Sequence, residues 1–455
     1  MEKEYAGDRP LPVGAGTFLW PVEGTRVLPP ARRVLYALGT FGSSILQQTV
    51  LLWVFYYYAP PASQGLPNRV APALLGVAMG VGRLVDAVVD PLVAHWSDHR
   101  RGPGGRRRPF IVIGTPLLAV VFALIWRPPD QTVTPANFLY LSVLLGLFFL
   151  LFTVVLNPYM ALLPEVTHEG RDRVSTAAWQ TVFTLSGTAV AFVVSAQLAA
   201  RVGFPAMGVL LAPLGALPML VAGAAVREHP IEEPRMDFLP VLRAVLGSHP
   251  FRVFIVGFAL LWLGLSMVNL SMALIVTVLM GLSRASVGTV LGISVVVTLL
   301  ATPVVTALAH RFGSHRTLLG AMVLAGALLP LLATLGWWPV PVSPAVQGYV
   351  VVALASPALA ALFTLPNTIL ADIAQAVGRD RGRRIEGMFF AFQGLILNGA
   401  TSVSSVLLGG VLGLLGYGTG LRLVPVIAAG FMVAAIAVLR RFPATSRQGV
   451  PGVVA

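Results

Sequence analysis

The chain has 455 residues, of which 56% are hydrophobic and only 11% are charged, and its mean hydropathy is +0.82. Soluble domains carry about 25% charged residues, so this composition excludes an ordinary soluble enzyme and indicates an integral membrane protein. The chain has no cysteine, which excludes disulfides and thiolate metal sites, and its only lysine is Lys3, which argues against a P-loop ATPase.

The first 33 residues are polar, contain several prolines and lack the apolar core of a secretory signal. Apolar runs of about 20 residues or more, long enough to cross a bilayer, then recur along the chain. They predict helices, because in lipid every backbone polar group has to be paired within its own segment. The twelve predicted spans are 34–58, 71–97, 109–127, 138–164, 174–200, 204–226, 251–280, 285–310, 318–338, 348–371, 388–415 and 421–439.

The connection between the sixth and seventh spans is longer and richer in charge than the other connections. It divides the chain into two sets of six spans. The predicted organisation is an N-terminal segment at 1–33, a six-helix half at 34–226, a central loop at 227–250, a second six-helix half at 251–441 and a tail at 442–455.

Basic residues are distributed unevenly between the two sides of the predicted bundle. Of the 31 lysines and arginines, 25 lie on the side of the termini, five lie on the other side, and Arg83 lies within a span. Because positively charged loops stay cytoplasmic, both termini are predicted in the cytoplasm and the protein in the inner (plasma) membrane. Anionic lipid headgroups then account for the net charge of +13, and nucleic acid is not an expected partner.

The two halves contain similar segments. NPYMALLPEVTHEGRDR in the first half resembles LPNTILADIAQAVGRDR in the second, so that Pro158 and Pro366 are 208 residues apart, as are the two Arg-Asp-Arg triplets. DPLVAHWSDHRRG likewise resembles TPVVTALAHRFGSHR. This duplication predicts the all-α major facilitator fold, a membrane protein of twelve transmembrane helices in two six-helix halves with the substrate site between them.

Asp86 and Asp90 are the two acidic residues that lie well within an apolar run. Their spacing places both carboxylates on one face of a helix, where two like charges need a cation or a proton to share. The corresponding residues of the second half are Thr298 and Thr302, so the acids are not part of a scaffold common to both halves. Because intramembrane acids mark functional sites, Asp86 and Asp90 are predicted to bind a cation, and they are the metal ligands expected in this chain.

Arg83 offers an alternative role for one of these acids. It precedes Asp86 by three residues and can form an ion pair with it, but it does not easily neutralise Asp90 as well. Thr153 and Asn157 in the fourth span share the same four-residue spacing and are candidate partners of the acids. The alternative for Thr153 is a hydrogen bond back to its own helix.

Three stretches of the chain resemble a known family. GRLVDAVVDPLVAHWSDHRRGPGGRRRPFIVIGTP resembles the helix-two signature of the glycoside–pentoside–hexuronide:cation symporters, the melibiose-carrier branch of the major facilitator superfamily. NPYMALLPEVTHEGRDRVSTAAWQTVFTLSG is similar to the segment from span four to span five of that family, and ADIAQAVGRDRGRRIEGMFFAFQGLILNG to its segment from span ten to span eleven. The resemblance covers most of the chain.

The resemblance implies that Asp86, Asp90 and Thr153 bind the coupling ion, which is Na⁺, Li⁺ or H⁺ in that family. It also exposes a difference, because the charged residues with which the sugar carriers hold their substrate are absent. At those positions this chain has neutral residues: Ser44, Leu156, Gln180 and Asn398, with Met160 in place of a tryptophan and Gln393 retained. The related lysolipid symporters share the acids and the threonine and also lack a full sugar clamp.

Neutral polar side chains remain as candidates for binding the substrate, although each could equally form a hydrogen bond between helices. The predicted substrate-binding residues are Ser44, Gln47, Asn157, Gln180, Gln393 and Asn398. A cytoplasmic latch between helices is predicted from structural and gating residues, whose alternative role is to set topology alone. The latch residues are Asp98 and the arginines of DHRRGPGGRRR, among them Arg106 and Arg107, and Arg83 within the span is a further structural or gating candidate.

The sequence therefore predicts a cation-coupled secondary symporter that takes a small neutral substrate, first of all a sugar or glycoside, by alternating access. One alternative substrate is a lysolipid or other amphiphile, and one alternative mechanism is proton-driven export. A non-transporting receptor or channel is a further alternative. An enzyme is not expected, because the chain contains no G-x-S-x-G or H-E-x-x-H motif. No cofactor is expected beyond the coupling ion. The predicted partners are the lipid bilayer and a small-molecule substrate, and the chain is expected to act as a monomer.

Overall fold

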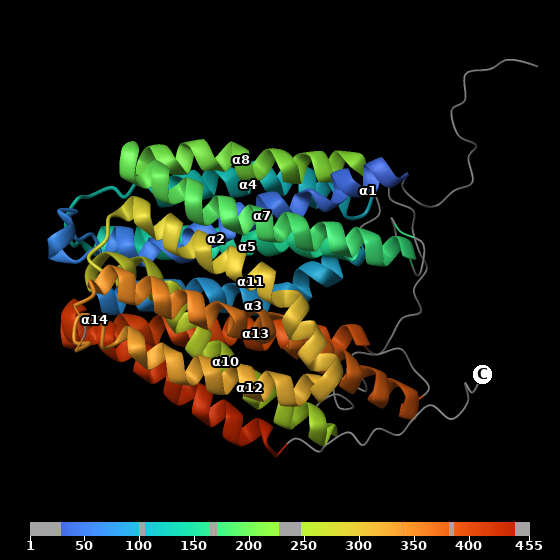
Figure 1. Ribbon diagram of the computed structural model, residues 1–455. Coiled ribbons are helices and arrows are strands. Elements are labelled where there is room, and N and C mark those ends of the chain that lie inside the picture. Colours follow the sequence, from blue (N-terminus) through green and yellow to red (C-terminus); the bar gives the residue numbers. More distant parts are fainter. Residues whose placement is uncertain are drawn as a thin grey trace, which may run out of the picture.

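The structure, a computed structural model, describes residues 29–99, 105–163, 167, 171–226, 247–339, 341–381 and 386–441, apart from some side chains near helix ends. Within these ranges the chain folds into long helices that run side by side (Figure 1). The α-helices are α1 (Pro30–Ala37), α2 (Gly39–Tyr58), α3 (Pro72–His99), α4 (Arg108–Ile125), α5 (Pro135–Ala161), α7 (Arg171–Arg201), α8 (Phe204–Ala225), α10 (His249–Leu274), α11 (Arg284–Phe312), α12 (Ser314–Leu328), α13 (Pro344–Arg381) and α14 (Glu386–Leu439).

Eleven helical segments of the described chain are long and apolar enough to cross a membrane. The last segment belongs to α14, whose 54 residues would extend for about 81 Å, far beyond the ~30 Å of a bilayer core. Gly416 interrupts this helix with φ 69° and ψ −178°. The helix therefore supplies two spans, and the described residues contain the twelve spans that the apolar runs predict.

Local sequence signals explain where many helices begin. Proline occupies the first turn of α1, α4, α5, α8 and α10, where its missing N–H costs no hydrogen bond. Thr134 caps α5 by accepting a hydrogen bond from the backbone N–H of Asn137, and Ser283 caps α11 in the same way through Ser286. These ends lie within a few residues of the predicted ones.

The two sets of six spans lie next to each other, the first mostly in the upper and the second mostly in the lower part of Figure 1, where α11 of the second half is drawn above α3 of the first. The halves contact each other chiefly through two pairs of helices, α3 against α14 and α7 against α11. The predicted central loop at 227–250 falls largely outside the described residues. The helix pairs nevertheless define the surface on which one half can move against the other.

Glycines allow α3 and α14 to approach closely. A Cβ atom on Gly76 would lie 2.5 Å from the carbonyl oxygen of Ser405, and one on Gly409 would lie 2.5 Å from that of Pro72. The Ser405 hydroxyl also donates to the Gly76 carbonyl at 3.2 Å. Small residues at this seam thus replace side-chain packing with backbone contact, as is common between membrane helices.

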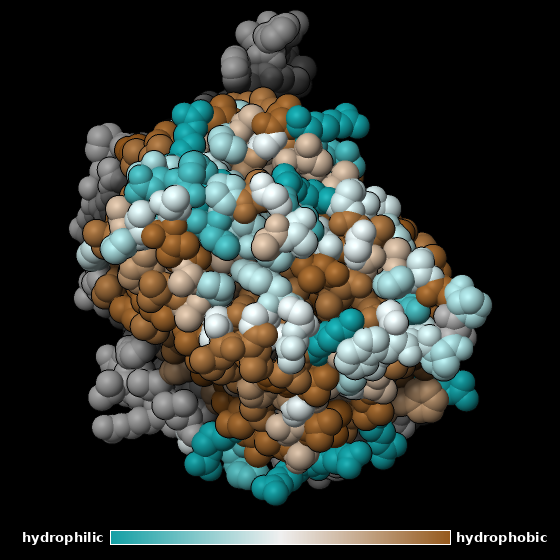
Figure 2. Space-filling model, turned by 90° about the vertical axis from the view of Figure 1, so that its left-hand side faces the viewer, coloured by the Kyte–Doolittle hydropathy of each residue, from teal (hydrophilic) through white to brown (hydrophobic). Residues whose placement is uncertain are grey.

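Hydrogen bonds between the halves gather toward the end of the bundle opposite the chain termini. Ser402 donates to the carbonyl of Gly80 at 2.8 Å, and the Tyr417 hydroxyl donates to the carbonyl of Ala59. In the connection after α2, the carbonyl of Gln64 accepts a hydrogen bond from Arg284 at 3.0 Å. Figure 2 looks onto this end, which is covered by polar side chains mixed among apolar ones. The structure therefore joins its halves at this end.

Candidate functional site

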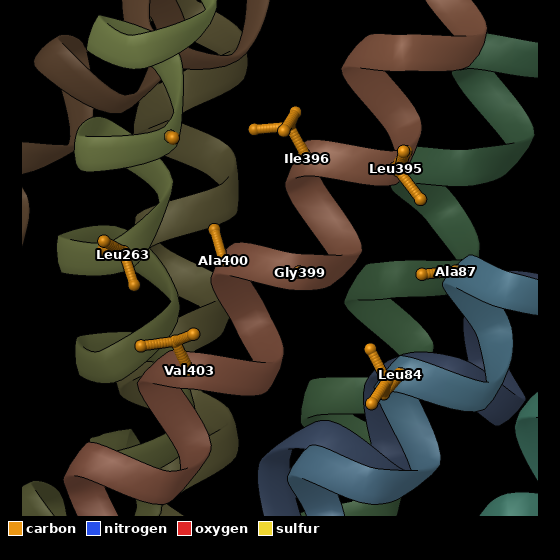
Figure 3. Close-up of a pocket in the computed structure, with 9 residues that line it drawn as sticks. Leu84, Ala87, Leu263, Leu395, Ile396, Gly399, Ala400 and Val403 are labelled. Carbon is orange, nitrogen blue, oxygen red and sulfur yellow. The ribbon is translucent and has the colours of Figure 1, made fainter.

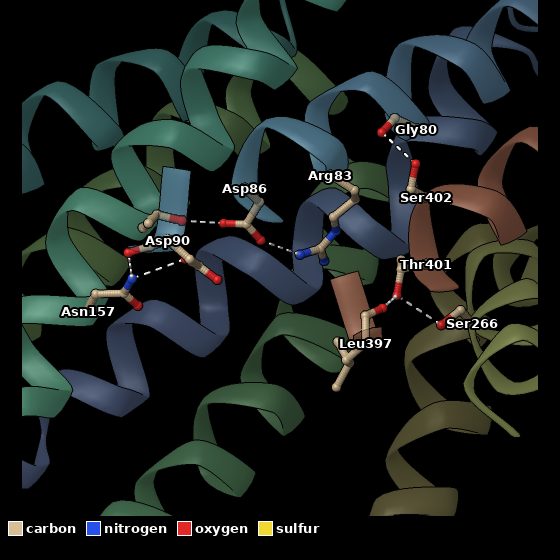
Figure 4. A network of polar contacts seen from close by, with 10 residues as sticks. Gly80, Arg83, Asp86, Asp90, Asn157, Ser266, Leu397, Thr401 and Ser402 are labelled. Carbon is tan, nitrogen blue, oxygen red and sulfur yellow. Dashed lines mark hydrogen bonds and ion pairs between the residues drawn. The ribbon is translucent and has the colours of Figure 1, made fainter. Parts of the chain in front are cut away.

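Two packed helices of the first half, α3 and α5, bring the predicted cation-site residues together (Figure 4). Asp86 and Asp90 are one turn apart on α3, and Thr153 and Asn157 are one turn apart on α5. The Thr153 hydroxyl donates to Asp86, and the Asn157 amide donates to Asp90 at 3.1 Å. The two bonds form successive rungs between the helices, because each joins residues 67 positions apart.

Asp86 is fully engaged by its neighbours. It is 4% exposed, and its Oδ2 atom lies 3.3 Å from the Nη1 atom of Arg83, which is itself 3% exposed. The other carboxylate oxygen, Oδ1, accepts the hydrogen bond from Thr153. The ion pair that the sequence offers as an alternative is therefore present, and the Thr153 hydroxyl bonds to Asp86 across the helix interface.

Aromatic packing holds Arg83 in place. The centre of its guanidinium group lies 4.2 Å from the centroid of the Phe149 ring on α5. This cation–π contact partly replaces the water that a buried guanidinium loses. Arg83 is thus a fixed positive charge directed at Asp86, and it belongs to the core of the site.

Asp90 differs from Asp86 in its charge balance. It is half-buried, and the described part of the chain contains no basic group within 4 Å of its carboxylate. Its hydrogen-bond donor is the neutral amide of Asn157, which also approaches the Asp90 backbone carbonyl at 3.4 Å. An ionised carboxylate in this position therefore still needs a positive partner.

The equivalent helix of the second half carries hydroxyls instead of acids. Thr298 on α11 donates to the carbonyl of Ser356 on α13 at 3.2 Å, and Thr302 donates to the carbonyl of Thr298 at 2.9 Å. The first bond links two helices and the second lies within α11, and neither creates a charge that has to be balanced. The structure thus places the acidic chemistry in one half.

The predicted substrate residues differ in how far their side chains are already hydrogen-bonded. Gln180 is buried and donates to the Tyr159 hydroxyl at 3.2 Å, and Gln393 donates to Asn367 at 3.0 Å, so both connect helices. Gln47 on α2 and Asn398 on α14 are half-buried and form no side-chain hydrogen bond within the described chain. Ser44 is 8% exposed within α2. Gln47 and Asn398 therefore keep the most polar capacity for a substrate.

The structure describes only some of the residues of the predicted latch. Arg107, at the start of α4, donates to the Ala161 carbonyl at the end of α5 at 2.5 Å, and this bond links two helices of the same half. Arg106 precedes it in the same turn, and Asp98 lies in the last turn of α3 with a side chain outside the described part. The latch between helices stays a prediction for Asp98.

An apolar cavity of about 350 Å³ lies between the two halves, beside the acidic pair. Figure 3 draws its lining residues, and those of α14 lie between Leu263 on α10 and the residues Leu84 and Ala87 on α3. The lining residues are Leu84, Ala87, Ala259, Leu263, Leu395, Ile396, Gly399, Ala400 and Val403. The predicted substrate site consists of polar residues and therefore misses this cavity. The signal that could have revealed it is the run of small and aliphatic residues at helical spacing from 395 to 403.

Comparison with known families identifies most of the chain. The family model described as "MFS/sugar transport protein" matches residues 35–439. This match covers nearly all described helices and includes both the acidic rungs and the cavity. The family is one of transporters and not of enzymes, in agreement with the prediction from sequence.

Similar proteins carry the names of symporters. "Inner membrane symporter YicJ" of Escherichia coli (strain K12) is 27% identical over 39% of this chain, and the chain covers only 37% of that relative's length. "Sodium-dependent lysophosphatidylcholine symporter 1" of Mus musculus is 24% identical over 74% of this chain and 70% of its own length. These findings confirm the predicted resemblance to major facilitator symporters.

Solved structures agree with the fold. The crystal structure of the nucleoside transporter NupG covers 90% of this chain and 98% of its own length, with a TM-score of 0.66 and 14% sequence identity. At this identity the likeness concerns the fold alone. It confirms the predicted major facilitator architecture.

Proposed function

Because this chain belongs to the MFS/sugar transport protein family, we propose that it is a cation-coupled secondary symporter that exposes a site between its halves alternately to each side of the membrane. The coupling ion, Na⁺, Li⁺ or H⁺, is cargo that moves with the substrate. Asp86, Asp90 and Thr153 are the proposed ion ligands. The protein works in this proposal as a monomer in the inner membrane, with both termini in the cytoplasm.

The charge balance of the two acids carries this proposal. One carboxylate has Arg83 at 3.3 Å, whereas the next, one helical turn away, accepts from the amide of Asn157 and has no basic group within 4 Å among the described residues. A second negative charge in this half-buried place is stable when a cation or a proton joins it. Oxygen atoms of carboxylates and hydroxyls are suitable ligands for hard cations. The site therefore favours positive cargo.

Arg83 gives this site a means of releasing the ion. In the geometry described here it pairs with Asp86, so an arriving cation has to compete with the guanidinium for that carboxylate. Arg83 cannot leave with the cargo, because it is covalently part of α3. We propose that Arg83 neutralises Asp86 whenever the ion is absent, so that the empty site keeps a single unbalanced carboxylate, that of Asp90, which the next cation or proton joins.

The substrate in this proposal is small and neutral. A sugar or glycoside fits the family description, and half-buried Gln47 and Asn398 can donate to and accept from hydroxyl groups. A lysolipid or other amphiphile is the second candidate, which the apolar cavity and the relative aligned over 74% of this chain favour. Transport in the opposite direction, driven by protons, would use the same acids.

A transport assay with the purified protein in liposomes tests the proposal. Labelled octyl glucoside and labelled lysophosphatidylcholine serve as probes, each with and without an inward sodium gradient and, separately, a proton gradient. We expect one gradient to stimulate uptake by wild type at least tenfold. We expect Asp90→Asn to abolish this stimulation, because the substitution removes the unpaired carboxylate.

Asp86→Asn separates the two roles of the other acid. If Asp86 is an ion ligand, this variant also loses gradient-stimulated uptake. If stimulation persists in Asp86→Asn, that acid serves as the partner of Arg83 alone. Uptake that ignores both gradients and both substitutions would contradict coupled symport, and accumulation driven outward would establish export.

A further inference from the structure

The cavity between the halves has the chemistry of a hydrocarbon site. Every described residue that lines it is Leu, Ile, Val, Ala or Gly. Its volume of about 350 Å³ is more than twice the ~150 Å³ of an enclosed apolar cavity that binds one benzene ring, but this cavity is open on one side. A sugar ring placed here would lose its hydrogen bonds to water and regain none from the lining side chains. An alkyl chain forms no hydrogen bonds with water, so it loses none when it enters the cavity.

The position of the cavity connects it to the ion site. Ala87 lines the cavity and lies three residues before Asp90, so the two share one side of α3 a single helical turn apart. The remaining lining residues come from α10 and α14 in the other half. A group in this cavity therefore touches both halves and lies about one helical turn from the half-buried acid, which does not itself line the cavity.

We infer that this cavity binds the hydrocarbon part of the transported molecule, and that the substrate is an amphiphile with a single alkyl chain. This inference rests on the proposed transport function and specifies the substrate class. The chain fills the space between α3, α10 and α14, and the polar head lies toward Asp90 and Asn157.

The charges near the head narrow its chemistry. Asp90 carries a potential negative charge at that end, and the nearby Arg83 is already paired with Asp86 and stacked on Phe149. An anionic head would meet repulsion and, among the described residues beside the acids, no guanidinium other than the paired one of Arg83. The head is therefore uncharged, like a sugar, or zwitterionic, like phosphocholine.

Binding to a homologous series tests the inference. The full-length protein is placed in lipid nanodiscs, and the probes are methyl, hexyl, octyl and decyl β-glucosides below their micellar concentrations, with protein-free nanodiscs as blank. We expect affinity to rise about fourfold per added methylene until the chain fills the cavity. Equal affinity along the series would overturn the inference. Lysophosphatidylcholines of matched chain length show which head binds tighter.

A cavity-filling variant provides the sharpest comparison. Gly399 lines the cavity, and a Cβ atom built there meets no other atom within 4 Å. Gly399→Leu therefore extends a side chain into the cavity from a Cβ position that meets no other atom, and we expect octyl glucoside affinity to fall at least tenfold. Gly410→Leu is the matched control, because Gly410 lies on the same helix with equally open space but does not line the cavity. Wild-type affinity in Gly399→Leu would overturn the inference.

Enlarging the cavity gives a second test of opposite sign. Leu84 lines it and is 55% exposed, so Leu84→Ala adds room without removing a core residue. We expect the best-bound chain to become longer by two or more methylenes, and an unchanged optimum would contradict the inference. Sodium dependence of uptake is measured in parallel. Chain selectivity that survives without ion coupling would support the cavity assignment and contradict coupled symport.

Discussion

Asp86 and Asp90 lie one helical turn apart, but their carboxylates have different neighbours. Asp86 is buried against a guanidinium and a hydroxyl, whereas Asp90 is half-buried beside an amide. Removing a partner from a buried charge costs more free energy than a surface pair gains, so both acids are sensitive to substitution of what surrounds them. The hydroxyl of Thr153 is the simplest of these partners to remove.

Thr153→Val keeps the shape of the side chain and deletes its hydroxyl. The lost hydrogen bond leaves a buried carboxylate oxygen of Asp86 without its donor, at a cost of about 1–3 kcal/mol. We expect the sodium concentration for half-maximal uptake to rise about 5–150-fold, if sodium is the coupling ion. Thr153→Ser restores the hydroxyl and should stay within threefold of wild type. Equal half-saturation in the valine variant would exclude Thr153 as an ion ligand.

At the scale of the helices, one residue makes two spans out of α14. Gly416 has φ 69° and ψ −178°, a backbone conformation that essentially only glycine adopts. Gly416→Ala should therefore lower the free energy of unfolding by about 1–3 kcal/mol, measured as thermal unfolding in nanodiscs. Gly418→Ala is the matched control, because Gly418 has helical backbone and open space for a Cβ atom. Equal stability of the two variants would contradict this account of the break.

The seam between α3 and α14 depends on the absence of side chains. A leucine at position 76 would place its Cβ atom 2.5 Å from the Ser405 carbonyl oxygen, so the helices have to separate. Overpacking of this kind costs about 1–3 kcal/mol, which lowers the population of the joined state about 5–150-fold. Gly76→Leu should therefore slow uptake by a similar factor. Gly410→Leu, on the open side of α14, should transport like wild type, and equal rates would show that this seam does not govern transport.

At the scale of the whole molecule, the two halves are joined at the end opposite the termini. The inter-half hydrogen bonds of the described residues, including Arg284 to Gln64 and Tyr417 to Ala59, lie toward that end. Alternating access requires these bonds to break when the other end closes. Which end faces the cytoplasm follows from the distribution of basic residues and can be tested directly.

The absence of cysteine makes the topology easy to measure, because any introduced cysteine is the single target for a thiol reagent. Ser63 is exposed in the connection between α2 and α3, and Ser446 lies in the C-terminal tail. A membrane-impermeant maleimide added to intact cells should label Ser63→Cys. It should label Ser446→Cys only after the membrane is opened. The reverse pattern would place both termini outside.

The predictions from sequence succeeded where a single segment carries the information. Apolar runs reveal spans because each span has to satisfy its own backbone in lipid, and a proline in the first turn marks a helix start. The acids were recognisable because a carboxylate in an apolar run is costly wherever the run packs. Twelve spans in two halves follow from such local facts, and Asp86 and Asp90 stay predicted ion ligands.

Tertiary structure alone decided how these residues pair and where space remains. The register between helices decides that Arg83 pairs with Asp86, and that Thr153 and Asn157 each donate to one of the two acids. It also decides that Gln180 and Gln393 bond to neighbouring helices. The cavity depends on three helices from two halves, and no single segment encodes a gap between others. The length of each apolar run determines the spans, whereas packing across the seam determines the space in which a substrate can bind.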